Sequence, residues 1–106
     1  MCGIVGILNS SSLKNNSIDI LKKLEYRGYD SAGISLFSKE RIKTIKSVGK
    51  ISELKNKAQN VSDKNFYGVI GHTRWATHGV VSKNNAHPLA NDYLTLVCNG
   101  IIENYR

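Results

Sequence analysis

The spacing of apolar positions in the first third of the chain predicts a short strand followed by a helix. A run of small and β-branched apolar residues over 2–8 is typical of a strand, and it stops at an asparagine and three serines. Downstream, three apolar residues recur on one helical face: Ile18, Leu21 and Leu24. Ser17 precedes them as the expected N-cap, and Gly28 follows where a helix end favours a residue with positive φ.

A hairpin and a second helix are expected next. Residues 31–37 and 41–48 have the composition of strands and are separated by the polar turn 38–40, which predicts an antiparallel pair. The following segment has helical spacing and is expected to end near Asn60. Its apolar positions are Ile51, Leu54 and Ala58.

The last third of the chain predicts two more strands around a long loop. Strand-like segments cover 67–73 and 93–98, and the connection 74–88 is longer than most loops in small domains. Loops of that length are usually lids, binding loops or disordered segments. The element order β, α, β, β, α, β, loop, β predicts a layered α/β or α+β domain.

Composition excludes several classes of function. A chain of 106 residues has the size of one small domain. Its net charge is +7, but eleven of its 15 basic residues are lysines scattered along the chain, so nucleic-acid binding is not expected. No apolar run is long enough to span a membrane, and the first one lacks the basic flank of an export signal. We therefore expect a cytoplasmic protein with no membrane association.

The cysteines and histidines do not predict a metal centre. Cys2 and Cys98 are a single pair in a chain without an export signal, so both are expected to be thiols. His72, His78 and His87 are six and nine residues apart, which matches none of the common zinc patterns. We expect neither a metal nor another cofactor.

Cys2 is the strongest candidate for chemistry. A small cysteine near the start of a chain is usually a buried apolar residue. Removal of Met1, which is common before a small second residue, would give Cys2 a free α-amino group with a pKa of about 8. One residue then provides a nucleophile and its own general base. The apolar strand that follows would hold these atoms on a rigid element.

Two further groups fit the attack of a thiol on a carboxamide. Asn99 and Gly100 offer a side-chain amide and an unobstructed backbone N–H for an oxyanion hole, with an ordinary Asn-Gly turn as the alternative. Arg74 offers a guanidinium that can bind a carboxylate through two hydrogen bonds, with a surface arginine as the alternative. The neighbours that can close over a ligand are Trp75, Thr77 and His78.

Five segments together resemble one family of enzymes. They are MCGIVGI, LEYRGYDSAG, HTRWATHG, NAHP and NGIIEN, in this order. Through them the chain, from Cys2 to Arg106, is similar to the glutaminase domain of the glutamine–fructose-6-phosphate amidotransferases. Other N-terminal-cysteine amidotransferases share the opening CGI and a variant of the RG-x-D block.

The resemblance implies a role for each matching residue. Cys2 would be the nucleophile once Met1 is removed. Arg27 and Gly28 would support this nucleophile. Asn99 and Gly100 would form the oxyanion hole. The glutamine carboxylate would be held by two residues of a closing loop, Arg74 and Thr77, and the other members of that loop would be Trp75, His78 and Gly79.

The resemblance also implies the fold and the larger assembly. The family has an α+β fold of the Ntn-hydrolase type, a four-layer αββα sandwich, of which residues 1–106 would be only the first part. L-Glutamine is the expected substrate. The family's two sugar-isomerase domains, which place the released ammonia on fructose 6-phosphate, are absent from this sequence. Full-length members are expected to be homo-oligomers.

The last residues raise an alternative. NGIIENYR starts what looks like a helix and stops after about one turn. We therefore expect a truncated chain that is inactive in isolation, and the alternative is a non-catalytic remnant of the enzyme. Cys98 also stands where the family usually has histidine. If residues 94–98 form a strand, Cys98 and Asn99 point to opposite faces, and the change leaves the oxyanion donor unaffected.

Overall fold

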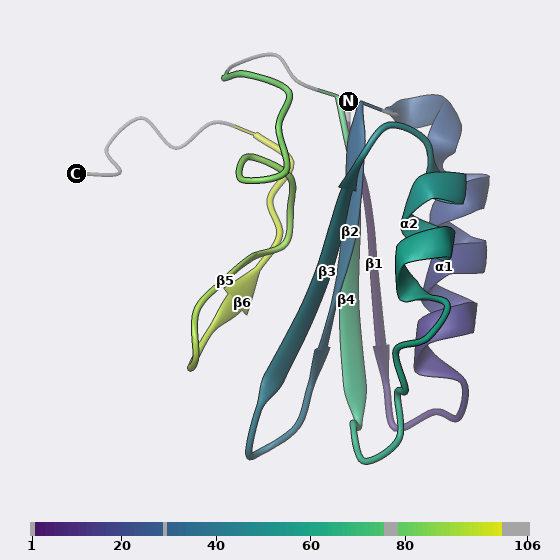
Figure 1. Cartoon of the computed structure of the whole chain (residues 1–106), viewed down its shortest axis with the longest axis vertical. Helices are drawn as coiled ribbons and strands as arrows, with labels where there is room; N and C mark the ends of the chain where they lie inside the picture. Colours follow the sequence, from purple (N-terminus) through teal and green to yellow (C-terminus); the bar gives the residue numbers. More distant parts are fainter. Residues whose placement is uncertain (1, 29, 76–78, 101–106) are drawn as a thin grey trace.

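A four-stranded antiparallel sheet with two helices on one face forms the main body of the chain (Figure 1). The computed structural model describes residues 2–28, 30–75 and 79–100. The strands lie in the order β1-β4-β2-β3, and each neighbouring pair is antiparallel. The elements are β1 Gly3–Leu8, α1 Leu13–Lys23, η1 Glu25–Arg27, β2 Ser31–Phe37, β3 Ile42–Val48, α2 Ile51–Ala58, β4 Gly68–Arg74, β5 Leu89–Ala90 and β6 Thr95–Leu96.

The core lies between the sheet and the two helices. Successive side chains of a strand point to opposite faces, so alternate apolar residues of each strand meet the helices. Leu21 of α1 and Leu54 of α2 are fully buried there. Burial of an aliphatic side chain of this size stabilises a fold by about 1.5–3 kcal/mol, so these contacts hold the two layers together. The strand residues of the core are Val5, Ala32, Ile34, Leu36, Ile45 and Val69.

A short hairpin, β5–β6, lies on the opposite face of the sheet (Figure 1). Lys46 Nζ of β3 donates to the carbonyl oxygen of Ala86 at 2.9 Å, which ties the chain before the hairpin to the sheet. Gly33 of β2 leaves room for the carbonyl group of His87, which would collide with a Cβ at that position. The first six residues of β2 are therefore buried, whichever face their side chains are on.

The sequence predictions of an α+β fold and of most elements are confirmed. The hairpin β2–β3, the helix α2 and the strands β1 and β4 agree with the predicted ranges within one or two residues at each end. These elements have strongly periodic or continuously apolar sequences, which are the most reliable local signals.

The predicted start and end of the first helix are wrong. α1 begins at Leu13, and Ser17 is buried in its middle, where Ser17 Oγ donates to the carbonyl oxygen of Lys14 at 2.9 Å. A serine hydroxyl can bond the backbone of its own helix as well as cap one, so its presence does not mark the first turn. The helix ends at Lys23, η1 follows, and Gly28 has extended backbone with a φ of 169° rather than a positive-φ cap.

The predicted strand 93–98 is wrong in most of its length, and β5 is not among the predicted elements. Asn91 Oδ1 accepts the backbone N–H groups of Tyr93 and Leu94, both at 2.8 Å. An asparagine that bonds the backbone two residues further on makes a turn. Tyr93 and Leu94 therefore form the tip of the hairpin, and only Thr95–Leu96 remains as strand.

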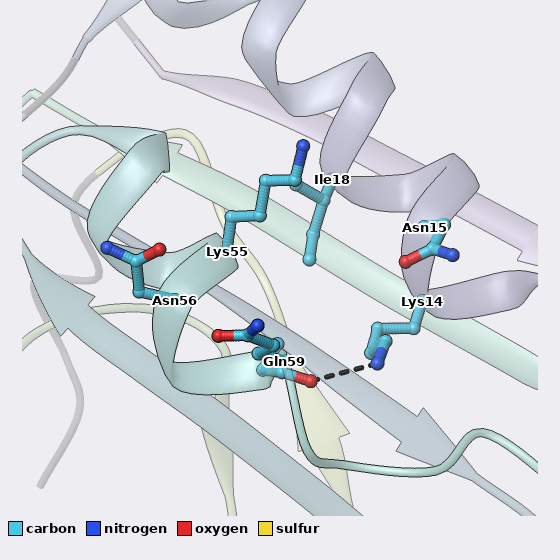
Figure 2. A pocket seen from close by; sticks show the side chains of 7 residues that line it. Lys14, Asn15, Ile18, Lys55, Asn56 and Gln59 are labelled. Atoms are coloured by element: carbon cyan, nitrogen blue, oxygen red, sulfur yellow. Dashed lines mark hydrogen bonds between the residues drawn. The ribbon is translucent and has the colours of Figure 1, made fainter.

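A cavity of about 320 Å³ lies between α1 and α2 (Figure 2). Lys14 Nζ donates to the carbonyl oxygens of Ala58 at 2.9 Å and Val61 at 2.7 Å. The last carbonyl groups of a helix have no partner within it, and a cation there interacts favourably with the helix dipole. Lys14 therefore joins the end of α2 to α1, and this cavity belongs to the packing of the helical layer.

Neither a membrane-spanning helix nor a cluster of three potential metal ligands occurs in the ranges 2–28, 30–75 and 79–100. The longer of the two α-helices there, α1, has 11 residues, whereas about 20 are needed to cross a bilayer.

Candidate active site

Three residues from distant parts of the sequence line one pocket at the start of β1. The pocket has a volume of about 270 Å³. Cys2, Arg27 and Asn99, which are all predicted site residues, share it. The remaining lining residues are Gly3, Ile4 and Leu24. The fold thus brings the predicted nucleophile, its predicted supporting arginine and the predicted oxyanion donor to one place.

The backbone next to the thiol is held by two side chains. The carbonyl oxygen of Cys2 accepts a hydrogen bond from Arg27 Nε at 3.1 Å, and the N–H of Gly3 donates to Thr73 Oγ1 at 3.1 Å. A Cβ at Gly3 would lie 2.8 Å from Leu24 Cβ and 2.8 Å from Thr73 Oγ1, so only glycine fits this approach. Cys2 is half-buried and its thiol is free. The sulfur therefore belongs to a fixed end of the chain rather than to a frayed one.

Gly28 lies close to the backbone of two other predicted site residues, Arg74 and Trp75. A Cβ on Gly28 would lie 2.8 Å from the carbonyl carbon of Arg74 and 2.8 Å from the nitrogen of Trp75. The N–H of Asp30 donates to the carbonyl oxygen of Arg74 at 3.1 Å and holds the two segments together. Glycine is required here because of space, and not because of positive φ.

Arg74 is the last residue of β4, and its side chain is directed at the segment 79–85. Only 9% of the residue is exposed, so the alternative of a surface arginine is wrong. Arg74 Nη1 donates to the carbonyl oxygen of Val80 at 3.2 Å, and Asn85 Nδ2 donates to the same oxygen at 2.9 Å. A Cβ built on Gly79, which has a φ of 82°, would lie 3.4 Å from Arg74 Nη2.

Not all predicted site residues share the pocket of Cys2. Thr77 and His78 lie outside the described residues. Trp75 is about half exposed at 47%. Five other predicted site residues lie within the described ranges but do not line this pocket: Gly28, Arg74, Trp75, Gly79 and Gly100. The structure thus gives one group around the thiol and one around the guanidinium, linked by the contact between Gly28 and the backbone of Arg74 and Trp75.

Two histidines to which the sequence analysis assigns no role hold the main chain before Asn99. His72 of β4 is fully buried, and its Nε2 donates to the carbonyl oxygen of Cys98 at 2.9 Å. The N–H of Cys98 donates to His87 Nδ1 at 3.3 Å. The two rings stack with centroids 4.4 Å apart and an angle of 21°. The available signal is that His72 lies two residues before Arg74 in one strand and so shares its face.

Burial keeps both rings neutral near pH 7. It lowers the pKa of His72 to about 4, although the hydrogen bond to the Cys98 carbonyl acts in the opposite direction. Burial also lowers the pKa of His87. His72 Nδ1 is buried and has no hydrogen-bond partner among the described residues, so a second proton on this ring would have no acceptor there. The charged side chains that act on one ring or both are Arg74, Lys46 and Asp30.

We expect the free energy of unfolding to decrease by about 2 kcal/mol between pH 7 and pH 4.5 because of His72 alone. Its pKa is about 4 in the folded chain and ordinarily 6.5, so the unfolded chain binds the proton more readily between these values. Stability that is present above pH 6.5 is therefore lost as the pH falls through this window. Urea denaturation at both pH values measures it, with the neutral variant His72→Gln as the matched comparison. An equal pH dependence of the two proteins would contradict the prediction.

Solved structures with a similar fold point to one class of enzyme. The structure titled as the allosteric regulatory enzyme of purine biosynthesis matches with a TM-score of 0.65 and 28% identity, over 84% of this chain and 19% of that one. Glutamine phosphoribosylpyrophosphate amidotransferase from B. subtilis, complexed with ADP and GMP, matches with a TM-score of 0.54 and 30% identity, over 83% and 18%. The chain has the fold of the N-terminal-nucleophile glutamine amidotransferases.

Comparison with curated sequences indicates which enzymes of this class the chain is related to. No family model matches the chain. Glutamine–fructose-6-phosphate aminotransferase (isomerizing) of Helicobacter pylori is 50% identical over 105 residues, which is 99% of this chain. The chain spans 18% of the length of that protein. It is a homologue of the N-terminal glutaminase region of these aminotransferases.

Proposed function

We propose that this chain provides the glutaminase site of a glutamine–fructose-6-phosphate aminotransferase. The observation that carries the proposal is the single pocket shared by Cys2, Arg27 and Asn99. A thiol nucleophile on a fixed backbone and an amide donor beside it are the parts needed for acyl transfer from a carboxamide. The homology to the Helicobacter pylori aminotransferase supports glutamine as the substrate.

The reaction runs through a thioester. After removal of Met1, the α-amino group of Cys2 accepts the thiol proton while the sulfur attacks the side-chain amide carbon of glutamine. The Asn99 amide and the Gly100 N–H bind the resulting oxyanion. The C–N bond then breaks, the proton on the amine passes to the departing nitrogen, and ammonia is released. Water attacks the thioester with the amine again as base, which yields glutamate and regenerates the thiol.

The second group of residues binds the other end of glutamine in this proposal. Arg74 and Thr77 hold its α-carboxylate, and the surrounding loop closes over it. The direction of the Arg74 guanidinium supports this assignment, because it donates to the carbonyl oxygen of Val80 and so lies against the segment that is proposed to close over glutamine. The loop residues involved are Trp75, His78 and Gly79.

The larger activity is also a proposal. Residues 1–106 would be the N-terminal part of a glutaminase domain, and the name and the longer chain of the Helicobacter pylori relative support this. Ammonia would pass to fructose 6-phosphate, bound by sugar-isomerase domains outside this sequence, and would give glucosamine 6-phosphate. We propose a cytoplasmic, homo-oligomeric enzyme that binds neither nucleic acid nor membrane.

Covalent labelling of Cys2 tests the glutaminase proposal. Two proteins are compared: the chain 1–106, and a graft in which it replaces the matching segment of the Helicobacter pylori enzyme. Each is treated with a diazoketone analogue of glutamine, and mass spectrometry identifies the modified residue. We expect one label per chain, on Cys2, in the graft, together with release of glutamate from L-glutamine. An excess of L-glutamine should prevent the labelling.

Two controls make the outcome decisive. The variant Cys2→Ser should take up no label, and iodoacetamide should alkylate Cys2 in the unmodified proteins, which shows that the thiol is accessible. If Cys2 reacts with iodoacetamide but neither the chain nor the graft is labelled by the glutamine analogue, the proposal is contradicted. The alternative of a non-catalytic remnant would then be favoured.

We expect Arg74→Lys to raise the KM for glutamine by about 5- to 150-fold, which corresponds to about 1–3 kcal/mol. Lysine keeps the positive charge but loses the two parallel hydrogen bonds of the guanidinium. Glutaminase kinetics of the graft measure the effect, with Arg41→Lys as the matched control because Arg41 stacks on Phe66, 4.5 Å from the ring centroid, and has no part in the site. An unchanged KM would remove Arg74 from glutamine binding.

A further inference from the structure

Asn99 follows a residue whose main chain is held on both sides by histidine rings. The carbonyl oxygen of Cys98 accepts from His72 Nε2 at 2.9 Å, and its N–H donates to His87 Nδ1 at 3.3 Å. We propose that His72 and His87 are positioning residues that place Asn99 beside Cys2, an inference that rests on the proposed function.

The two hydrogen bonds together fix the direction of the chain at this point. The N–H of Cys98 belongs to the peptide plane before its Cα, and the carbonyl belongs to the plane after it. Fixing both peptide planes sets the direction of the main chain from Cys98 to Asn99. β6 ends at Leu96, so the hydrogen bonds of the hairpin do not do this. The histidines therefore replace a strand ladder as the support of the residue that lines the pocket.

The support is itself built into the sheet. His72 is fully buried in β4, where its register partners are Ile4 of β1 and Gly33 of β2. The ring of His87 stacks on that of His72, and the preceding carbonyl, of Ala86, is bonded to the sheet. A group that must meet a developing oxyanion gains from such support, because an error of about 1 Å can cost about 100-fold in rate.

Each ring must be neutral and in one tautomer. A carbonyl oxygen only accepts, so His72 carries its proton on Nε2, and His87 Nδ1 accepts from an N–H, so it carries none. The charged groups that face the rings are Arg74 and Lys46, which disfavour a proton there, and Asp30, which favours one on His72. This pattern defines conservative replacements: glutamine places an N–H near the position of Nε2, and asparagine places an oxygen near that of Nδ1.

The kinetic test uses two pairs of variants in the graft. His72→Leu and His87→Leu remove the hydrogen bonds, whereas His72→Gln and His87→Asn can retain them. We expect the leucine variants to lower kcat for glutamine hydrolysis by about 10- to 100-fold with KM within about twofold, and the polar variants to recover most of the rate. A loss of the same size in the leucine and polar variants would overturn the inference, as would unchanged kcat in the leucine variants.

A double-mutant cycle with Asn99→Ala separates positioning from general damage to the fold. If the histidines act through Asn99, His72→Leu should lower kcat no further once Asn99 is alanine, whereas independent effects would multiply. Alkylation of Cys2 by iodoacetamide, which needs no oxyanion donor, should proceed at the unmodified rate in every variant. Multiplying losses in kcat, or slowed alkylation, would show a purely structural role.

Hydrogen exchange in the chain itself keeps the inference testable without activity. We expect the backbone amide of Cys98 to exchange at least about tenfold faster in His87→Leu than in the unmodified chain, and at a nearly unchanged rate in His87→Asn. Equal exchange rates in the unmodified chain and both variants would overturn the inference that the histidines hold the main chain of Cys98. If the graft shows no glutaminase activity but the exchange rates are as expected, the proposed function fails. The inference that the histidines hold the main chain of Cys98 is then still supported.

Discussion

A form of the graft that cannot lose Met1 is expected to hydrolyse glutamine about 100- to 10,000-fold more slowly than the processed form. Blocking the α-amino group of Cys2 with a further peptide bond removes the general base of the proposed mechanism and leaves the thiol in place. The affected step is the formation of the thioester.

The measurement compares one protein before and after cleavage. The graft is made with an N-terminal extension and a protease site that leaves Cys2 as the first residue. Labelling by the diazoketone analogue and release of glutamate should be about 100- to 10,000-fold slower before cleavage than after it. If the extended protein turns over normally, a mechanism in which a histidine such as His78 or His87 activates the thiol would replace the one proposed here.

Replacing Asn99 by alanine is expected to lower kcat by about 100- to 1,000-fold while KM changes little. Asn99 lines the pocket of Cys2, and its amide is proposed to donate to an oxygen that becomes charged only during the reaction. Such a donor contributes to the transition state more than to the binding of substrate. Truncation should therefore leave the iodoacetamide reactivity of Cys2 unchanged.

Asn15→Ala is a suitable control, because Asn15 is exposed on α1 beside the cavity between the helices. Its kinetic constants should match those of the unmodified graft. A decrease in kcat of less than about threefold for Asn99→Ala would assign the oxyanion to the N–H of Gly100 alone.

Local patterns predicted most of the elements, and the exceptions have a common cause. Alternation and apolar spacing are properties of a segment, and they located β2, β3 and α2 closely. The start of α1 and the strand 93–98 were predicted wrongly because the short polar side chains of Ser17 and Asn91 can bond the backbone in a helix, a cap or a turn. Which of these occurs depends on packing by distant residues, and no local pattern contains that information.

The site shows the same division. Cys2, Arg27 and Asn99 have side chains whose chemistry can be recognised in the sequence, and the fold brings these three together. The roles of Gly28 and of the two histidines depend on contacts between segments far apart along the chain, such as the approach of Gly28 to the backbone of Arg74. The prediction that strand alternation separates Cys98 from Asn99 rested on a strand that ends at Leu96.

The antiparallel register of β1 has a consequence for the nucleophile. Gly3 pairs with Thr73 and Leu8 pairs with Gly68, so the position of Cys2 is set by the number of residues between it and the core. Loss or gain of one residue in β1 would move the sulfur by about 3.4 Å and turn it to the other face of the sheet. The number of residues in β1 therefore sets the position of the nucleophile. Point substitutions that keep this number should be tolerated far better than any single deletion.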